Sequence, residues 1–207
     1  MQENAGTVTK EAGKTKISGR VRALCVTAML SAVAYILMFL DFSVPLMPSF
    51  IKMDISELPA LIGGFALGPA AGVTVCLVKN LLHLLQTQTG GVGELSNFIL
   101  GACFVLPASL IYARKKTKKT AVIAAISGAV IMAVASVFSN YYIVYPVYTK
   151  FMPMEAILEA YRAIRPSAGG LMECLITFNM PFTFVKGMIS VIITLLIYKK
   201  LSPILKG

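Results

Sequence analysis

Residues 95–113 read LSNFILGACFVLPASLIYA, a run of 19 positions without one charged side chain. A helix needs about 20 predominantly apolar residues to cross the hydrocarbon core of a bilayer, so this run predicts a membrane span. Similar stretches lie on both sides of it along the chain. We expect helices over residues 23–40, 56–67, 70–86, 95–113, 120–149 and 172–198, with Gly68-Pro69 as a tight turn between the second and third. The sequence therefore predicts an all-α integral membrane protein with six transmembrane helices.

The composition excludes an ordinary water-soluble protein. Of the 207 residues, 57% are hydrophobic and 14% are charged, whereas soluble domains average about 45–50% and about 25%. A transmembrane β-barrel would alternate apolar and polar positions over strands of roughly 10 residues, and the runs here are continuous instead. Six spans with short loops use most of the chain, which leaves no room for a nucleotide-hydrolysing domain.

Basic residues indicate the orientation of the chain. Thirteen of the 19 lysines and arginines lie before the first predicted span, between the fourth and fifth, or after the sixth. Cytoplasmic loops carry the excess of lysine and arginine, so both termini are predicted to be cytoplasmic. Residues 1–19 then form a frayed polar tail, residues 20–201 the six-helix domain in the cell membrane, and residues 202–207 a second cytoplasmic tail. This topology and anionic lipid headgroups account for the net charge of +10 without a nucleic-acid partner.

Two lysines lie inside predicted spans, where an ionisable group costs about 2.5–3.5 kcal/mol on insertion scales. Lys186 is near the middle of the last span, and Lys79 is in the third. Pro181 disturbs the helix before Lys186 because it lacks an N–H group, and broken backbone at membrane depth is tolerated where it lines a cavity. Thr183 and Lys186, three positions apart, share one helix face. Each lysine is either an interior residue bonded to backbone carbonyls or a donor that faces a polar ligand.

Other polar residues near helix ends are further candidates. Asn140 ends the fifth apolar run, and its side-chain amide can both donate and accept hydrogen bonds. The four tyrosines within residues 141–148 are also typical of an interfacial aromatic belt. Glu94 and Asn97 lie near the outer end of the fourth span, where Glu94 also suits the positive N-terminus of a helix. We interpret the single histidine, His83, as a packed or interfacial residue.

No catalytic or metal-binding pattern is visible in the sequence. The four cysteines form no C-x-x-C pair and are interpreted as small buried hydrophobes. Every acidic residue is predicted near a helix end, whereas an ion-driven carrier commonly has an acid inside the membrane. Segment 41–57 is unusually apolar for an exposed loop, so we expect it to fold over another part of the protein, and residues 154–164 predict a short amphipathic helix. The sequence thus favours a non-enzymatic, ligand-binding subunit of a larger assembly.

Seven segments stand in a recognisable order and spacing. They read AMLSA (28–32), PSFIKMDISELP (48–59), GPAAG (68–72), VKNL (78–81), GELSNF (93–98), NYY with YP (140–142 and 145–146) and PFTFVKG (181–187). Over residues 20–200 the chain resembles the riboflavin-specific substrate-binding (S) subunits of energy-coupling factor (ECF) vitamin transporters. The resemblance implies six helices and one vitamin bound near the outer face, beneath the loop between the first two helices.

The resemblance also implies which residues contact the ligand and the partners. By motif match the ligand contacts are Phe50, Lys52, Asn140, Thr183 and Lys186, and the expected ligand-binding set adds Leu46, Met47 and Asn97. Of these, the residues at 46, 47 and 50 would hold a flat flavin ring, and the polar ones would meet its oxygens and hydroxyls. Ala28 and Ala32 would dock onto a transmembrane coupling (T) component that two ABC-type ATPases drive. From spacing alone, the same two alanines equally suit internal helix packing.

Two positions depart from the pattern of the family, which often has Asn at 183 and Tyr at 50, where this chain has Thr183 and Phe50. The outer segment between the fifth and sixth spans is also longer. Three alternatives therefore stay open: the ligand is FMN instead of riboflavin, it is another vitamin, or the chain is a stand-alone secondary carrier of a polar solute.

Overall fold

A computed structural model describes residues 3–45, 47–87 and 89–206. In chain order the α-helices are α1 (Glu3–Met38), α2 (Glu57–Leu67), α3 (Pro69–His83), α4 (Val92–Arg114), α5 (Lys118–Ser139), α6 (Tyr145–Tyr148), α7 (Met154–Arg162), α8 (Leu171–Cys174) and α9 (Met180–Lys206). A 3-10 turn (Leu84–Gln86) extends α3, and π-helical turns join α5 to α6 (Asn140–Val144) and α8 to α9 (Leu175–Asn179). The strands β1 (Phe42–Ser43) and β2 (Lys52–Met53) pair antiparallel between α1 and α2.

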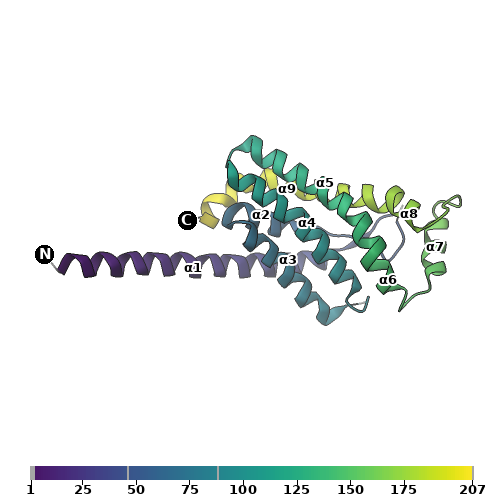
Figure 1. The fold of residues 1–207 in the computed structure, drawn as a ribbon, viewed down its shortest axis with the longest axis horizontal. Coiled ribbons are helices and arrows are strands. Elements are labelled where there is room, and N and C mark those ends of the chain that lie inside the picture. The colour runs from purple at the N-terminus through teal and green to yellow at the C-terminus, as the bar shows by residue number, and fades with distance from the viewer. Residues whose placement is uncertain (1–2, 46, 88, 207) are drawn as a thin grey trace.

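The long helices form one bundle with two distinct ends (Figure 1). The C-terminal part of α9, the α4–α5 connection and the N-terminal part of α1 lie at one end, and α7 lies at the other. α1 is helical from Glu3 and extends beyond the bundle, so the tail that was expected to fray continues the first helix. The short helix predicted over residues 154–164 is confirmed as α7.

Four helical stretches are long and apolar enough to cross a membrane by themselves: Gly19–Met38, Val92–Arg114, Lys118–Tyr148 and Leu171–Tyr198. α2 has only 11 residues, which at about 1.5 Å per residue is roughly half of a 30 Å hydrocarbon core. α3 has 15 residues. All six predicted apolar segments are helical. Among the described residues, however, only four of these segments belong to helical stretches of full span length. The residues that would lengthen α2 instead form the ribbon and loops of the α1–α2 connection.

Glycines set the path and the spacing of α2 and α3. Gly68 adopts φ 109°, a conformation that favours glycine, and Pro69 then begins α3, which confirms the predicted turn. A Cβ atom on Gly72 would lie 2.9 Å from Gly64 Cα. The absence of side chains at these two positions therefore lets the helices of the pair pack closely.

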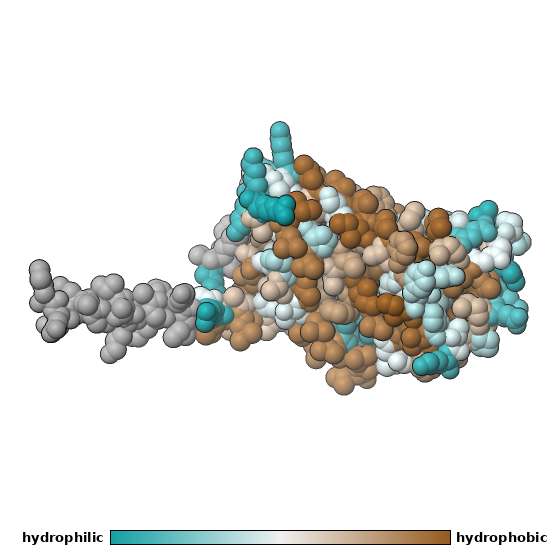
Figure 2. Space-filling view, viewed as in Figure 1, coloured by the Kyte–Doolittle hydropathy of each residue, from teal (hydrophilic) through white to brown (hydrophobic). Residues whose placement is uncertain are grey.

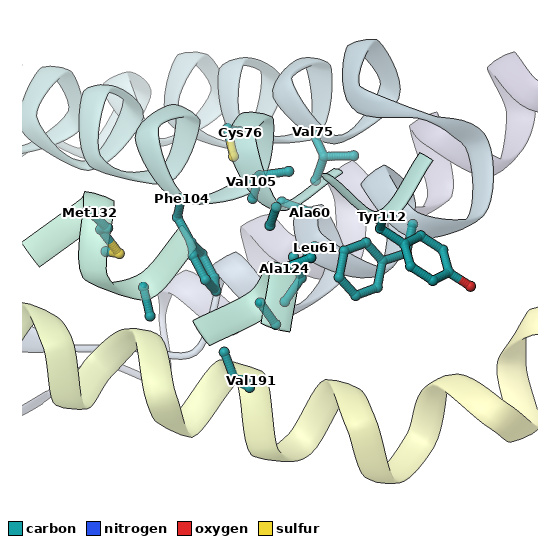
Figure 3. Packing of buried hydrophobic residues seen from close by; sticks show 14 of the residues in the cluster. Ala60, Leu61, Val75, Cys76, Phe104, Val105, Tyr112, Ala124, Met132 and Val191 are labelled. Carbon is teal, nitrogen blue, oxygen red and sulfur yellow. The ribbon is translucent and has the colours of Figure 1, made fainter. Parts of the chain in front are cut away.

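The main core lies where α4 and α5 meet α2, α3 and α9 (Figure 3). Phe104 and Val105 of α4 are fully buried there, close to Ala124 of α5 and Val191 of α9. A Cβ atom on Gly128 of α5 would lie 2.5 Å from the carbonyl oxygen of Phe104, so this glycine allows the backbones of α4 and α5 to approach. The packing uses small residues at helix contacts, as helical membrane proteins do.

The outside of the bundle is apolar along its flank and polar toward its ends (Figure 2). Large hydrophobic side chains face outward from several helices, among them Leu24, which is 71% exposed, Ile123, which is 61%, and Leu196, which is 71%. An apolar patch of this extent on a protein surface marks contact with a membrane or a partner. The surface therefore agrees with the prediction of an integral membrane protein.

A proline follows each π-helical turn. Pro146 comes two residues after Asn140–Val144, and Pro181 comes two residues after Leu175–Asn179. Proline lacks an N–H group and its ring crowds the carbonyl four residues earlier, and a wider π turn relieves that conflict. The disturbance predicted before Lys186 is therefore present as a π turn, and both turns carry a buried asparagine, Asn140 and Asn179.

Candidate ligand-binding site

A cavity of about 480 Å³ opens at the end of the bundle that carries α7. Its walls come from the α1–α2 connection, the end of α3, the start of α4, the junction of α5 with α6 and the start of α9. The volume lies within the range of about 300–1,000 Å³ that is typical of small-molecule sites. Both π turns border it, because Asn140 and Asn179 line the wall.

Six of the eight predicted ligand-binding residues line this one cavity: Phe50, Lys52, Asn97, Asn140, Thr183 and Lys186. Met47 lies in the loop between β1 and β2 and is buried, but among the described residues it is not part of the cavity wall. Leu46 lies outside the described residues.

The two predicted span lysines meet acidic side chains in the interior. Lys186 Nζ donates to Asp54 Oδ2 at 2.8 Å and lies 3.4 Å from Glu57 Oε2. Lys79 Nζ donates to Glu57 Oε1 at 2.9 Å and to Asn97 Oδ1 at 3.3 Å. The side chains of Lys79 and Glu57 are at most 1% exposed. Two lysines and two carboxylates thus form one buried cluster with balanced charge.

This cluster agrees with one expectation and corrects another. Asp54 and Glu57 lie at the start of α2, near a helix end as predicted, and both are buried, because the α1–α2 connection turns into the bundle before α2 begins. The lysines pair with carboxylates instead of backbone carbonyls. Lys186 also lines the cavity. Lys79 is not among the described residues of the cavity wall, but it donates a hydrogen bond to Asn97, which is.

Asp54 is held through both of its carboxylate oxygens. One oxygen accepts from Lys186, and the other accepts hydrogen bonds from the backbone and hydroxyl of Ser56. The ion pair between Asp54 and Lys186 therefore holds the α1–α2 connection against α9, inside the bundle.

A second ion pair lies at the rim of the cavity. Lys52 Nζ is 3.0 Å from Asp41 Oδ2, and both side chains are about one-third or more exposed. Lys52 stands on β2 opposite Ser43 of β1, so the ribbon places this lysine beside the cavity. An exposed pair of this kind contributes at most about 1 kcal/mol, so Lys52 can exchange Asp41 for another acceptor at low cost.

Glu94, a candidate from the sequence, forms a polar wall with His83, and this pairing was not predicted. His83 Nδ1 is 2.8 Å from Glu94 Oε1, and the hydroxyls of Thr87 and Thr89 donate to Glu94 Oε2 at 2.9 and 3.2 Å. Both His83 and Glu94 line the cavity. His83 is therefore part of the cavity wall and not only a packed residue. Its pairing depends on the turn between α3 and α4, which brings the two helix ends together.

The tyrosines of residues 141–148 divide between two environments. Tyr142 is 68% exposed, as an aromatic belt requires, whereas Tyr145 is buried and lines the cavity with Tyr148. Five positions separate Tyr145 from Asn140, so α-helical spacing would not put them on one face, and the π turn between them does. Tyr145 contacts the hydroxyl of Tyr161 from α7, whose own O–H donates to Asn179 Oδ1 at 2.6 Å. Burial raises the pKa of Tyr161 well above its usual range, so its hydroxyl stays protonated.

Ala28 and Ala32 lie on the exposed side of α1. The inner side of the same helix presents Thr27, Ser31 and Ala34 to the bundle, each at most 8% exposed. Internal packing therefore does not use the two alanines in this chain, and their face is available to another helix. Among the described residues, no group of three or more His, Cys, Asp or Glu side chains could hold a metal ion.

Comparison with known proteins agrees with this architecture. Residues 22–198 match the family model described as "ECF transporter, substrate-specific component". The riboflavin transporter RibU of Staphylococcus aureus (strain TCH60) is 32% identical over 195 residues, which cover 94% of this chain and 98% of the relative. The riboflavin transporter FmnP of Bacillus subtilis (strain 168) is 32% identical over 187 residues, 89% of this chain and 94% of the relative.

A solved structure, described as "Structure and mechanism of the S component of a bacterial ECF transporter", is similar with a TM-score of 0.72 and 31% sequence identity. The similarity covers 91% of this chain and 99% of that one. Because the family match takes in most of the chain, the protein belongs to the substrate-specific components of ECF transporters, which are cell-membrane proteins and not enzymes.

Proposed function

We propose that this chain binds riboflavin in the cavity at the α7 end and delivers it across the cell membrane as the specificity subunit of an ATP-driven ECF importer. The observation that carries the proposal is the position of Lys186, whose buried ammonium group lines the cavity from within the span-length helical stretch Leu171–Tyr198. The names of relatives such as RibU and FmnP support riboflavin as the ligand.

The cavity offers both kinds of contact that a flavin needs. Phe50 and Tyr148, with ring centroids 6.2 Å apart, supply aromatic surface for a flat ring system. Asn140, Thr183 and Lys186 supply hydrogen-bonding groups for its polar edge and hydroxyls. A lysine ammonium has three donors. Lys186 donates to Asp54 and forms a longer ion pair with Glu57 at 3.4 Å, so in this proposal it keeps a donor for an acceptor on the ligand.

In this proposal the chain crosses the membrane six times with both termini cytoplasmic. The basic α4–α5 connection and the C-terminal part of α9 lie at the same end of the bundle, which supports that orientation. The short helices α2 and α3 cross together with the inward-turning α1–α2 connection. Residues 20–201 then form the membrane domain, with cytoplasmic tails at 1–19 and 202–207.

The proposed partners are a T component and two ABC-type ATPases. The exposed Ala28 and Ala32 support docking through α1, because small residues four apart let another helix approach closely. We do not assign the chain an energy source of its own: the buried acids Asp54 and Glu57 are each paired with a lysine. Where no subunit covers the outer surface, the lipid bilayer contacts it.

Equilibrium titration of the purified protein tests the ligand. Riboflavin is expected to bind one-to-one with quenching of its fluorescence, and FMN and a panel of other vitamins are titrated in parallel. No response to riboflavin would overturn the proposal, and tighter binding of FMN or another vitamin would reassign the ligand.

Transport by reconstituted vesicles tests the assembly. Vesicles with this chain alone are expected to take up no riboflavin, and vesicles that also hold the T component and both ATPases are expected to accumulate it when ATP is supplied. Uptake by the chain alone would instead identify a stand-alone carrier.

A further inference from the structure

Hydroxyl and amide groups from three separate elements meet beside the cavity. Tyr161 of α7 donates to Asn179 Oδ1 at 2.6 Å, the hydroxyls of Tyr145 and Tyr161 are in hydrogen-bond contact, and Asn179 Nδ2 is 3.5 Å from the Tyr145 oxygen. All three residues are buried: Tyr145 is 3% exposed, Tyr161 is 0% exposed and Asn179 is 5% exposed. Tyr145 and Asn179 line the cavity, while Tyr161, in the described structure, lies outside its wall.

The number of hydrogens determines the direction of these bonds. Each tyrosine hydroxyl has one hydrogen, and an amide oxygen can only accept. Tyr161 gives its hydrogen to Asn179, so the bond between the two tyrosines uses the hydrogen of Tyr145. Asn179 Nδ2 donates to the Tyr145 oxygen and closes a ring of three bonds. The ring uses both tyrosine hydrogens and one of the two amide hydrogens.

The closed ring leaves a defined pattern for the cavity. One N–H of Asn179 remains, together with oxygen lone pairs, and neither tyrosine has a hydrogen left to donate. The Asn179 amide can reverse only if both tyrosine hydrogens reverse with it, because a partial reversal leaves buried polar groups without partners, at about 1–3 kcal/mol each. The orientation of Asn179 is therefore coupled to the hydroxyl of Tyr161.

The surroundings hold Tyr161 rigidly. The ring of Phe50 meets it edge-on at 6.3 Å and 84°, and the ring of Phe178 lies 5.5 Å away. Ile157, one turn earlier on α7, is fully buried in the same cluster. The backbone of Asn179 is set independently, by the π turn that ends there. A rigid hydroxyl from one element thus faces a fixed asparagine on another.

We propose that Tyr161 is a positioning residue that orients the Asn179 amide, so that Asn179 presents an N–H donor to a hydrogen-bond acceptor of the bound ligand. The inference rests on the proposed function and adds a specificity rule to it. At the free N–H of Asn179, the wall then suits a ligand carbonyl oxygen or ring nitrogen, as a flavin can offer.

A double-mutant cycle with riboflavin as the probe tests this coupling. Full-length wild type, Tyr161→Phe, Asn179→Ala and the double variant are titrated, and thermal unfolding is followed for each. Tyr161→Phe is expected to weaken binding about fivefold to tenfold, as the loss of one net hydrogen bond does. In the Asn179→Ala background the same change is expected to alter affinity less than about twofold, because Tyr161 then has no amide to orient.

Tyr198→Phe is the matched control. It removes a hydroxyl that donates to the Phe65 carbonyl at 3.2 Å, away from the cavity, and is expected to leave riboflavin affinity at the wild-type value. Equal losses from Tyr161→Phe in both backgrounds, an unchanged affinity, or a Tyr161→Phe protein that does not fold would each assign Tyr161 a purely structural role and overturn the inference. If the wild-type protein does not bind riboflavin, the proposed function and this inference are both overturned. If the wild type and Tyr161→Phe bind riboflavin with equal affinity, the inference alone is overturned.

Discussion

Lys186 Nζ lies 2.8 Å from Asp54 Oδ2, and this contact joins α9 to the α1–α2 connection across 132 positions of sequence. Glu57 and Lys79 extend the contact into a cluster of four charges. A buried ion pair adds little net stability over apolar packing, but removal of one partner leaves an uncompensated charge. The cluster therefore specifies where the connection lies, and with it the floor of the cavity.

Lys79→Met is expected to lower the free energy of unfolding by about 3–5 kcal/mol, because Glu57 then keeps its burial and loses its nearer lysine. The double variant Lys79→Met/Glu57→Leu is expected to recover most of that loss, since Lys186 and Asp54 remain as a neutral pair. Thermal unfolding in detergent measures both. A double variant no more stable than Lys79→Met would show that charge balance does not govern this cluster.

Lys186→Met is expected to weaken riboflavin binding by about tenfold or more, since a hydrogen bond to a charged group contributes about 1.5–3 kcal/mol. Isothermal titration calorimetry measures the effect. Lys150→Met, which removes an exposed lysine in the α6–α7 connection, is the control and is expected to bind as wild type does. Equal affinities for both variants would remove Lys186 from the ligand site.

Gly128→Ala is expected to destabilise the protein by about 1–3 kcal/mol, because its Cβ would meet the Phe104 carbonyl oxygen at 2.5 Å and push α4 from α5. At Gly170 a Cβ atom would meet nothing within 4 Å, and the backbone there is extended. Gly170→Ala is therefore the control, with an expected unfolding temperature near that of wild type. Equal unfolding temperatures for Gly128→Ala and Gly170→Ala would show that close approach of α4 and α5 does not need a glycine at position 128.

Ala28→Trp and Ala32→Trp are expected to abolish riboflavin uptake by vesicles that contain the T component and ATPases, because a bulky side chain prevents another helix from approaching α1. Riboflavin binding by the purified variants is expected to remain, since both positions face outward. Val130→Trp, at an outward position on α5, is the control and should transport normally. Normal uptake by the two α1 variants would place the docking surface elsewhere.

Polar residues within apolar helices were the part of the site that could be found in advance. Asn140, Thr183 and Lys186 stand out because burial of such groups in a membrane is costly without a role. His83 and Tyr161 could not be assigned this way, because one pairs with Glu94 across a turn and the other is buried by the folding back of α7. The burial of Asp54 and Glu57 was not predicted for the same reason, since nothing local shows that their connection turns inward.

By itself, the sequence determined the helical membrane class, the positions of the apolar helices and the turn at Gly68, because these depend on local hydrophobicity and backbone geometry. Tertiary structure alone decided which charges pair, which tyrosine is buried and how far the α1–α2 connection reaches into the bundle. Those outcomes depend on contacts between residues far apart in the chain, where the cost of an unpaired buried charge or hydroxyl selects the partner.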